Sequence, residues 1–248
     1  MEITTTVIIG MVVVLIAGFV SGLSGFGFAL VGAPPLLLLY DPAAVVLFTK
    51  LLPLMTAVII LVNTWDKIDR RTVAGLLPAA ILGAVVGLPL LTRVPAPLIA
   101  LVAGIVVTGF AIAVMRGWTP PGVATARATG IAGFTSGILL TLTGQSGPPV
   151  ILLLTGRGFS PQPFRATAAG YFFLTNIIGL LVLILGRAVD RTDAKDALAL
   201  LPAAAFGAIA GQVMSKRVPP ARFRDMVFIL LLATGIVAIL TSAWALTH

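Results

Sequence analysis

The residues best suited to chemistry form two short stretches of glycine and small polar side chains. Residues 22–27 (Gly-Leu-Ser-Gly-Phe-Gly) and 143–147 (Thr-Gly-Gln-Ser-Gly) each lie inside a long apolar run, shortly before a Pro-Pro pair. Glycine weakens a helix and proline lacks an amide donor, so we expect each run to unwind before Pro34-Pro35 and Pro148-Pro149. Backbone amides freed there cannot face lipid, and at the start of the following half-helix they favour an anion in a protein-lined cavity.

Two cations at membrane depth could complete such a site. Lys50 lies in an otherwise apolar run eight residues after Pro42, and Arg165 follows the segment Ser-Pro-Gln-Pro-Phe. A charge inside the bilayer is costly and indicates a functional role, although Lys50 could also extend to the membrane interface and Arg165 could contact lipid headgroups. The alternative for both glycine-rich stretches is a packing kink supported by Ser and Thr hydroxyls. The candidate substrate-binding residues are Ser24, Gly25, Phe26, Gly27, Lys50, Thr143, Gly144, Gln145, Ser146, Gly147 and Arg165.

The residue types that the sequence lacks exclude several functions. It has no Cys, its only His is His248, and all eight Asp and Glu fall at or near predicted helix ends. Thiol, imidazole and proton-relay chemistry therefore lack the groups they need. Ser24 lies in a Gly-x-Ser-Gly string like that of intramembrane serine proteases, but the membrane region offers no His as its base. We therefore expect neither an enzyme nor a bound cofactor or metal.

The elements that must position these residues are apolar helices. Of the 248 residues, 59% are hydrophobic and 10% are charged, with mean hydropathy +1.14 and net charge +8. Most uncharged runs are long enough for one crossing of a hydrocarbon core of about 30 Å. The basic residues fall between the runs, which predicts loop anchors and not a nucleic-acid surface. The sequence thus predicts an all-α polytopic protein of the bacterial inner membrane. Its first run lacks the basic start of a signal peptide, so we expect the mature protein to keep it.

The two halves of the sequence carry the same landmarks in the same order. Pro34-Pro35 matches Pro148-Pro149 at an offset of 114, and the strings at 76–80 and 93–95 recur at an offset of 124. This self-similarity predicts two transmembrane repeats, at 1–115 and 128–248, joined by a linker at 116–127.

Three Gly-x-x-x-Gly pairs place small residues one helical turn apart. They are Gly18 and Gly22, Gly83 and Gly87, and Gly207 and Gly211. Such pairs allow helix backbones to approach closely in lipid, so we expect them to mark helix packing before any binding role.

The number of crossings depends on whether the first run of each half crosses once or twice. Single crossings give eight segments and place 8 and 7 basic residues on the two sides, whereas double crossings divide them 11 against 4. The second division agrees with the positive-inside tendency. It also makes the repeats inverted, with discontinuous or re-entrant helices at the first segment of each repeat, an arrangement typical of secondary transporters. Residues 128–156 are too few for two full crossings, so the sequence leaves the number of membrane segments between 8 and 10.

These interruptions, each followed by proline and a Leu-rich run, resemble those of the sulfite exporter TauE/SafE family, also called the toluene-sulfonate uptake permease family. The resemblance covers nearly the whole chain and implies transport of sulfite, thiosulfate or organosulfonates. By motif, the first interruption corresponds to Ser24, Gly25 and Gly27, and the second to Gly144, Gln145 and Gly147. The chain departs from the family pattern at Phe28 and at Gln145-Ser146, where glycine is frequent, which implies a narrower or differently polar pocket.

We therefore predict a secondary transporter of a small anion, with sulfite, thiosulfate or an organosulfonate bound at facing half-helix N-termini near the bilayer midplane. Two alternatives are a passive anion channel that uses the same site and a membrane scaffold subunit that transports nothing. The expected partners are the anionic substrate and membrane lipid, with a homodimer left open and no nucleic acid.

Overall fold

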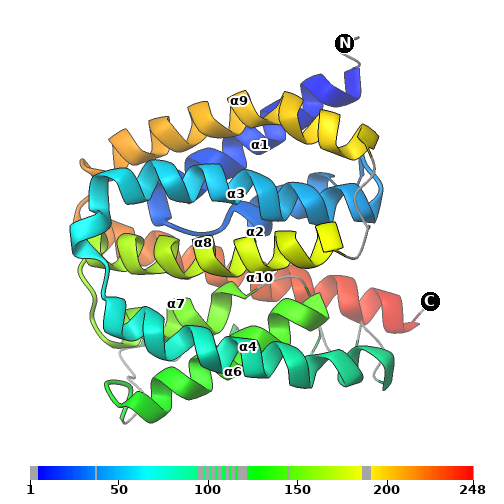
Figure 1. Cartoon of the computed structure of the whole chain (residues 1–248). Helices are drawn as coiled ribbons and strands as arrows, with labels where there is room; N and C mark the ends of the chain where they lie inside the picture. The colour runs from blue at the N-terminus through cyan, green and yellow to red at the C-terminus, as the bar shows by residue number, and fades with distance from the viewer. Residues whose placement is uncertain are drawn as a thin grey trace. The chain divides into compact units, whose positions relative to one another are not determined.

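All regular secondary structure in the described part of the chain is helical. The computed structural model describes residues 5–36, 38–93, 98, 101, 104–105, 108–109, 112, 115–116, 122–143, 146–185 and 191–247. No β-strand occurs among these residues (Figure 1), which confirms the predicted all-α fold. The helices are α1 (Thr5–Ser24), α2 (Phe28–Leu36), α3 (Pro42–Thr64), the short 3-10 helix η1 (Trp65–Lys67), α4 (Arg70–Arg93), α6 (Ala126–Thr143), α7 (Gly147–Gly156), α8 (Pro161–Leu185), α9 (Arg191–Ser215) and α10 (Pro220–Thr247).

Five of the described helical stretches are long and apolar enough to cross a membrane. They are Thr5–Ser24, Ala44–Lys67, Arg70–Gly87, Pro161–Leu181 and Thr192–Ser215. The chain is a multi-pass membrane protein, as its composition predicts. The total of 8 to 10 segments stays a prediction.

The helices gather into two compact units. Unit 1 comprises Met1–Ile68 and Arg165–Val218, and unit 2 comprises Asp69–Phe164 and Pro219–His248. Each unit therefore takes helices from both halves of the sequence. The units are a division in space, and the predicted division into repeats at 1–115 and 128–248 stays a statement about the sequence.

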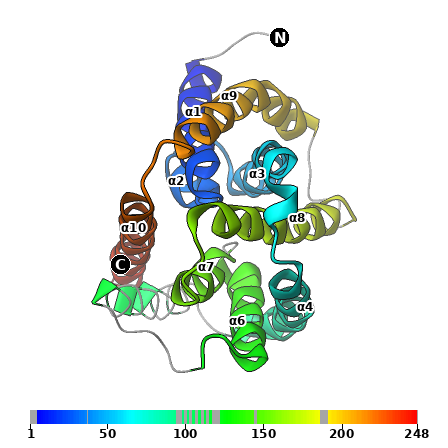
Figure 2. The ribbon, with the colours of Figure 1, turned by 90° about the vertical axis from the view of Figure 1, so that its left-hand side faces the viewer.

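In unit 1, the consecutive long helices α1 and α3 run in the same direction. A Cβ added to Gly10 in the first half of α1 would lie 2.9 Å from the Tyr40 hydroxyl, which directly precedes α3. Farther along both helices, the hydroxyls of Ser21 and Thr56 lie 3.3 Å apart. Because the two helices are parallel, the segment between them must bring the chain back. The short helix α2 and residues 38–41 make this return, and Figure 2 shows α2 beside α1 and α3.

Helix α9 runs parallel to α1 and closes the core of unit 1. Tyr40 packs against the core cluster that contains Ala197 and Leu200 of α9, so the end of the return lies close to the first turns of α9. The core cluster draws buried side chains from all four of these helices. They include Val14 and Ala17 of α1, Phe28 and Leu36 of α2, Phe48 and Leu52 of α3, and Leu200 and Ala204 of α9.

Helix α8 lies antiparallel to α3 in unit 1. Near its start, Ala169 packs against Ile60 and Leu61 in the last turns of α3. Farther along, a Cβ added to Gly179 would lie 3.2 Å from the side chain of Lys50 in the first half of α3. The start of α8 and the end of α3 therefore lie at the same end of unit 1.

The Gly-x-x-x-Gly pairs of α1 and α9 interlock. A Cβ at Gly18 or Gly22 would collide with a carbonyl oxygen of α9, at Ala204 or Ala208 respectively. Conversely, a Cβ at Gly207 or Gly211 would collide with a carbonyl oxygen of α1. The predicted packing role of these glycines is therefore confirmed, because only a hydrogen in place of a side chain lets the two backbones come this close.

Helices α4 and α6 of unit 2 also pack closely through glycines. A Cβ at Gly83 would collide with the Phe134 carbonyl of α6, and one at Gly137 would collide with the Ala80 carbonyl of α4. The Thr141 hydroxyl adds a hydrogen bond of 3.0 Å to the Ala84 carbonyl. The packing role predicted for Gly83 is confirmed, whereas its partner glycines on α6 were not singled out from the sequence.

The chain also returns on itself after α6. The Ser136 hydroxyl in the middle of α6 donates a bond of 2.6 Å to the carbonyl of Ser146, just before α7. At the other end of α7, Arg157 donates to the carbonyl of Val123 at 2.8 Å and to the Thr129 hydroxyl at 2.6 Å. Since Val123 and Thr129 flank the start of α6, the short helix α7 carries the chain back to the level where α6 began.

The Pro-Pro pairs occupy different places in the two short helices. Pro148-Pro149 lie in the first turn of α7, as expected, but Pro34-Pro35 lie in the last turn of α2. Both interruptions do precede their prolines. In the first half, however, the helix restarts at Phe28 without proline's help, so matching the pairs at an offset of 114 does not align the two short helices.

Candidate anion site

The first interruption is a tight turn built from two glycines. Gly25 and Gly27 have φ of 86° and 90°, values that side-chain-bearing residues rarely adopt. The Gly25 amide still donates to the Ser21 carbonyl at 2.7 Å, which closes the last turn of α1. A Cβ on Gly25 would also lie 2.8 Å from the Cα of Arg165, so the turn packs directly on the backbone of α8.

Ser24 supports this turn from inside. Its side chain is 0% exposed, and its hydroxyl lies 2.8 Å from the Val20 carbonyl and 2.7 Å from the Phe26 carbonyl. The same oxygen accepts from the Phe26 amide at 3.3 Å. These bonds occupy the single hydroxyl hydrogen. The structure thus gives Ser24 a backbone-bracing role, and its predicted contact with substrate stays a prediction.

The first turn of α2 presents amide hydrogens without intrahelical acceptors. The Val31 amide makes the first helical bond, to the Gly27 carbonyl at 3.1 Å. The amides of Phe28, Ala29 and Leu30 precede it and therefore have no partner within the helix. Together with the helix dipole, such amides favour a negative group.

Arg165 is the buried cation beside this interruption. Its side chain is 3% exposed, and its terminal nitrogen Nη2 donates to the Gly22 carbonyl at 2.5 Å and to Oε1 of Gln212. Its Nε is buried and has no hydrogen-bond partner in the described part of the chain. Both acceptors are neutral. The guanidinium therefore caps the carbonyl end of α1 and retains a donor that no described group uses.

Lys50 lies at a different level of unit 1. It is buried, and its aliphatic stem packs against Gly179 of α8. Gly179 is 14 residues beyond Arg165 on the same helix, which corresponds to about 21 Å along its axis. The structure therefore does not bring the two predicted cations together.

The second interruption is only partly described. Gly144, Gln145 and the side chain of Thr143 lie outside the described residues, so the predictions for them are untested. Ser146 is buried and precedes Gly147, the first residue of α7.

The first turn of α7 offers fewer amide donors than the first turn of α2. Pro148 and Pro149 occupy the second and third positions of α7 and have no N–H, so Gly147 supplies the single donor among its first three residues. The corresponding turn of α2 keeps all three. The described donors for an anion therefore concentrate at the first interruption.

Gln212 lies beside Arg165 at the candidate site and is not among the residues predicted from the sequence. It lies on α9, is 6% exposed and accepts a hydrogen bond from Arg165. One signal was present, because Gln212 is the sole amide side chain in the apolar run 197–215 and directly follows Gly211. Its position beside Arg165 depends on the close approach of α9 to α1, which the sequence does not give by itself.

No group of three or more His, Cys, Asp or Glu side chains that could hold a metal occurs among the residues that the structure describes. The features brought together in unit 1 are a buried guanidinium, an uncharged amide, a left-handed glycine turn and the start of a half-helix. They provide hydrogen-bond donors and one positive charge, which suit the binding of a small anion and not covalent chemistry.

Comparisons with known proteins identify a family and a relative to which the chain is similar. The sequence model of the family described as "Sulfite exporter TauE/SafE" matches residues 10–238. The chain is also similar to a protein of Comamonas testosteroni described as "Probable inner membrane transporter protein TsaS", with 26% identity over 178 residues, which cover 68% of this chain and 72% of that protein. No solved structure matches the chain significantly.

Proposed function

The chain belongs to the sulfite exporter TauE/SafE family, and we propose that it is a secondary transporter of a small anion that binds beside Arg165 at the first interruption. One observation carries the proposal. Arg165 is 3% exposed, and among the described residues its guanidinium has two neutral acceptors and an Nε donor without a partner. A buried charge of this kind is costly, and an anion beside it would offset the cost.

A purely structural role for Arg165 must be weighed against this. The last carbonyl groups of a helix lack intrahelical donors and favour a cation. Capping of α1 at the Gly22 carbonyl therefore accounts for one hydrogen bond of Arg165. Capping does not require a charge at this depth, because a neutral donor such as an amide could satisfy the same carbonyl. We therefore assign Arg165 both roles, as the cap of α1 and as the charge that attracts substrate.

The proposed substrate class is a sulfur oxyanion, namely sulfite, thiosulfate or an organosulfonate. The description of the family as sulfite exporters supports it. Chemistry supports it as well, since sulfur oxyanions present several acceptor oxygens that suit the planar donors of arginine and the amides at the start of α2. We propose that the bound anion lies near the bilayer midplane, since the interruption between α1 and α2 falls inside the uncharged run at residues 3–40.

The proposed topology is two inverted repeats of five segments each. The return of the chain through α2, and again through α7, supports two passages for the first run of each half. The second helices of the interrupted runs, α2 with 9 residues and α7 with 10, are short, which agrees with re-entrant segments and not with full crossings.

Transport by proteoliposomes that contain the purified protein tests the proposal. We expect saturable uptake of radiolabelled thiosulfate, competed by sulfite and an alkylsulfonate. Arg165→Gln should reduce uptake at least about tenfold, which corresponds to about 1.4 kcal/mol of binding, and Arg165→Lys should retain part of it.

The matched control is Arg71→Gln, which removes an exposed arginine from α4 and should leave uptake unchanged. Melting temperatures of all variants, measured with and without ligand, separate loss of the α1 cap from loss of binding. Wild-type uptake that rises linearly without saturation would instead favour the passive channel. If neither transport nor binding of any of these anions occurred, the scaffold alternative would stand and the proposal would be wrong.

A further inference from the structure

We propose that Gln212 is a positioning residue whose lack of charge sets the preference of the site for anions. It holds the guanidinium of Arg165 with an amide oxygen where a carboxylate would cancel the positive charge. This inference rests on the proposed function and adds to it the residue that controls the net charge of the site.

The position of Gln212 follows from the seam between α1 and α9. Gly211, its neighbour in the chain, lies so close to α1 that a Cβ there would collide with the Phe19 carbonyl. Gly22 of α1 meets α9 one turn earlier, at Ala208. The glycines thus bring Gln212 level with the end of α1, where both its Oε1 and the Gly22 carbonyl accept from Nη2 of Arg165. Arg165 is therefore oriented by two fixed acceptors.

The chemistry of the two acceptors determines what charge remains. Nη2 carries two hydrogens, and its bonds to Gly22 and Gln212 use both. Neither acceptor is ionised, so the guanidinium keeps its full positive charge while its orientation is fixed. Its buried Nε donor then has no acceptor among the described residues. An oxygen of a bound oxyanion would supply that acceptor and the missing negative charge together.

Stability alone would favour glutamate at this position. Glutamate has nearly the shape of glutamine, and its charge-assisted bond to arginine is roughly twice as strong as a neutral one. A purely structural role for residue 212 therefore predicts that Gln212→Glu keeps or improves both stability and function. Our inference predicts that Gln212→Glu keeps or raises stability but weakens anion binding. The carboxylate would neutralise the positive charge of Arg165 that otherwise attracts the anion.

The experiment measures the melting temperature and the affinity for thiosulfate of detergent-purified variants. For Gln212→Glu we expect a melting temperature equal to or above that of the wild type without ligand, and at least about tenfold weaker binding, or about 1.4 kcal/mol. Gln212→Met removes the acceptor without adding charge, so it should lower the melting temperature and weaken binding less than Gln212→Glu does. Gln162→Glu introduces the same charge at an exposed glutamine of α8 and should bind like the wild type.

The outcomes separate this inference from the proposed function. Binding by Gln212→Glu at the wild-type level, while Arg165→Gln fails to bind, would overturn the inference and leave the transporter proposal in place. A Gln212→Glu protein that does not fold would also overturn it, because the paired charges are expected to be stable. Absence of anion binding in the wild type would overturn both.

Discussion

At the scale of single residues, the site depends on which polar atoms are already used. Ser24 and Arg165 were both predicted as donors to substrate, yet the Ser24 hydroxyl bonds to the backbone of its own turn. Arg165 keeps its Nε for another partner. Residue type and spacing predicted an interruption and a buried charge, whereas the hydrogen bonds show that Ser24 braces the turn and that Arg165 keeps a donor.

Gly25 offers a direct test of this turn, because two separate effects oppose any side chain there. Its φ of 86° costs an alanine about 1–2 kcal/mol, and a Cβ would lie 2.8 Å from the Cα of Arg165. We expect Gly25→Ala to destabilise the protein by a further 1–3 kcal/mol, roughly, through overpacking, and to weaken anion binding by displacing Arg165. Thermal unfolding and thiosulfate titration in the same detergent measure both effects.

Gly158 provides the matched control for that substitution. It has a φ of 68°, but nothing lies within 4 Å of an added Cβ. Gly158→Ala should therefore show the backbone cost alone and bind thiosulfate normally. Equal losses of stability in the two variants would mean that the contact between Gly25 and α8 contributes nothing.

Part of this site could be predicted from the sequence because glycine and proline report backbone conformation locally. The interruption near Ser24 to Gly27 and the buried charge of Arg165 are examples. Gln212 could not be predicted, since nothing in its own neighbourhood places it beside a residue 47 positions earlier in the chain. The predicted role of Lys50 stays a prediction, because its position on α3 does not reveal that Arg165 lies at another level of unit 1.

At the scale of helices, the same kind of glycine contact holds one helix pair together in each unit. The parallel pairs α1 with α9 and α4 with α6 meet through glycines whose hydrogen atoms face carbonyl oxygens of the partner helix. In lipid there is little hydrophobic force between helices, so close backbone approach and van der Waals contact supply the attraction. The short helix α2 follows α1, the short helix α7 follows α6, and each returns the chain to where the preceding helix began.

Gly137 tests the pair α4 and α6. A Cβ on Gly137 would collide with the Ala80 carbonyl, whereas one on Gly130, two turns earlier on α6, would meet nothing within 4 Å. We expect Gly137→Ala to lose about 1–3 kcal/mol of stability, and Gly130→Ala to gain up to about 1 kcal/mol from better helix propensity. Thermal unfolding of the two variants gives the comparison. A Gly137→Ala protein that melts with or above Gly130→Ala would show that the helices are farther apart than described.

The positions of the helices could be predicted from the sequence better than which helices pack against each other. The apolar runs and the spacing of Gly83 and Gly87 indicated helices with a close-packing face. The facing residues on α6, Gly133 and Gly137, have the same spacing but were not recognised, because they lie among Ser and Thr just before the second interruption. Pro34-Pro35 misled the comparison of the halves, since proline suits the first turn of a helix and here lies in the last turn of α2.

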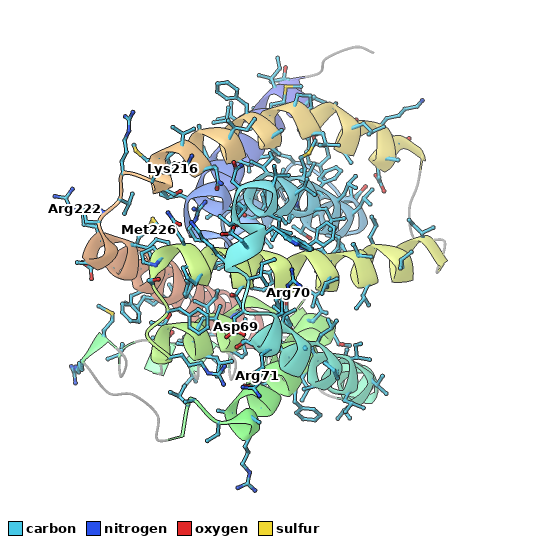
Figure 3. All side chains as sticks on the ribbon, turned by 60° about the vertical axis from the view of Figure 1, so that its left-hand side comes forward. Asp69, Arg70, Arg71, Lys216, Arg222 and Met226 are labelled. Carbon is cyan, nitrogen blue, oxygen red and sulfur yellow. The ribbon has the colours of Figure 1, made fainter. Side chains whose placement is uncertain are left out.

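At the scale of the whole molecule, charge and chain path support one topology. Several basic residues lie at helix ends, as Figure 3 shows for Arg70 and Arg71 at the start of α4 and for Lys216 just after α9. The ten-segment topology places all of these on the side that carries 11 basic residues. It also requires α3 and α8 to be antiparallel, whereas the eight-segment topology requires them to be parallel. The contacts of Ala169 and Gly179 support the antiparallel arrangement within unit 1.

Because the sequence has no Cys, single cysteines can report the side of the membrane without background labelling. Asp66, Ser160 and Thr192 are exposed and lie at or beyond helix ends, so Cys should be tolerated at each. The ten-segment topology places residues 66 and 160 on the basic, cytoplasmic side and residue 192 opposite. A membrane-impermeant maleimide added to intact cells should then label Thr192→Cys alone, and all three after the cells are opened. The eight-segment topology pairs residue 66 with residue 192, so joint labelling of these two, without residue 160, would remove the inverted repeats from the proposal.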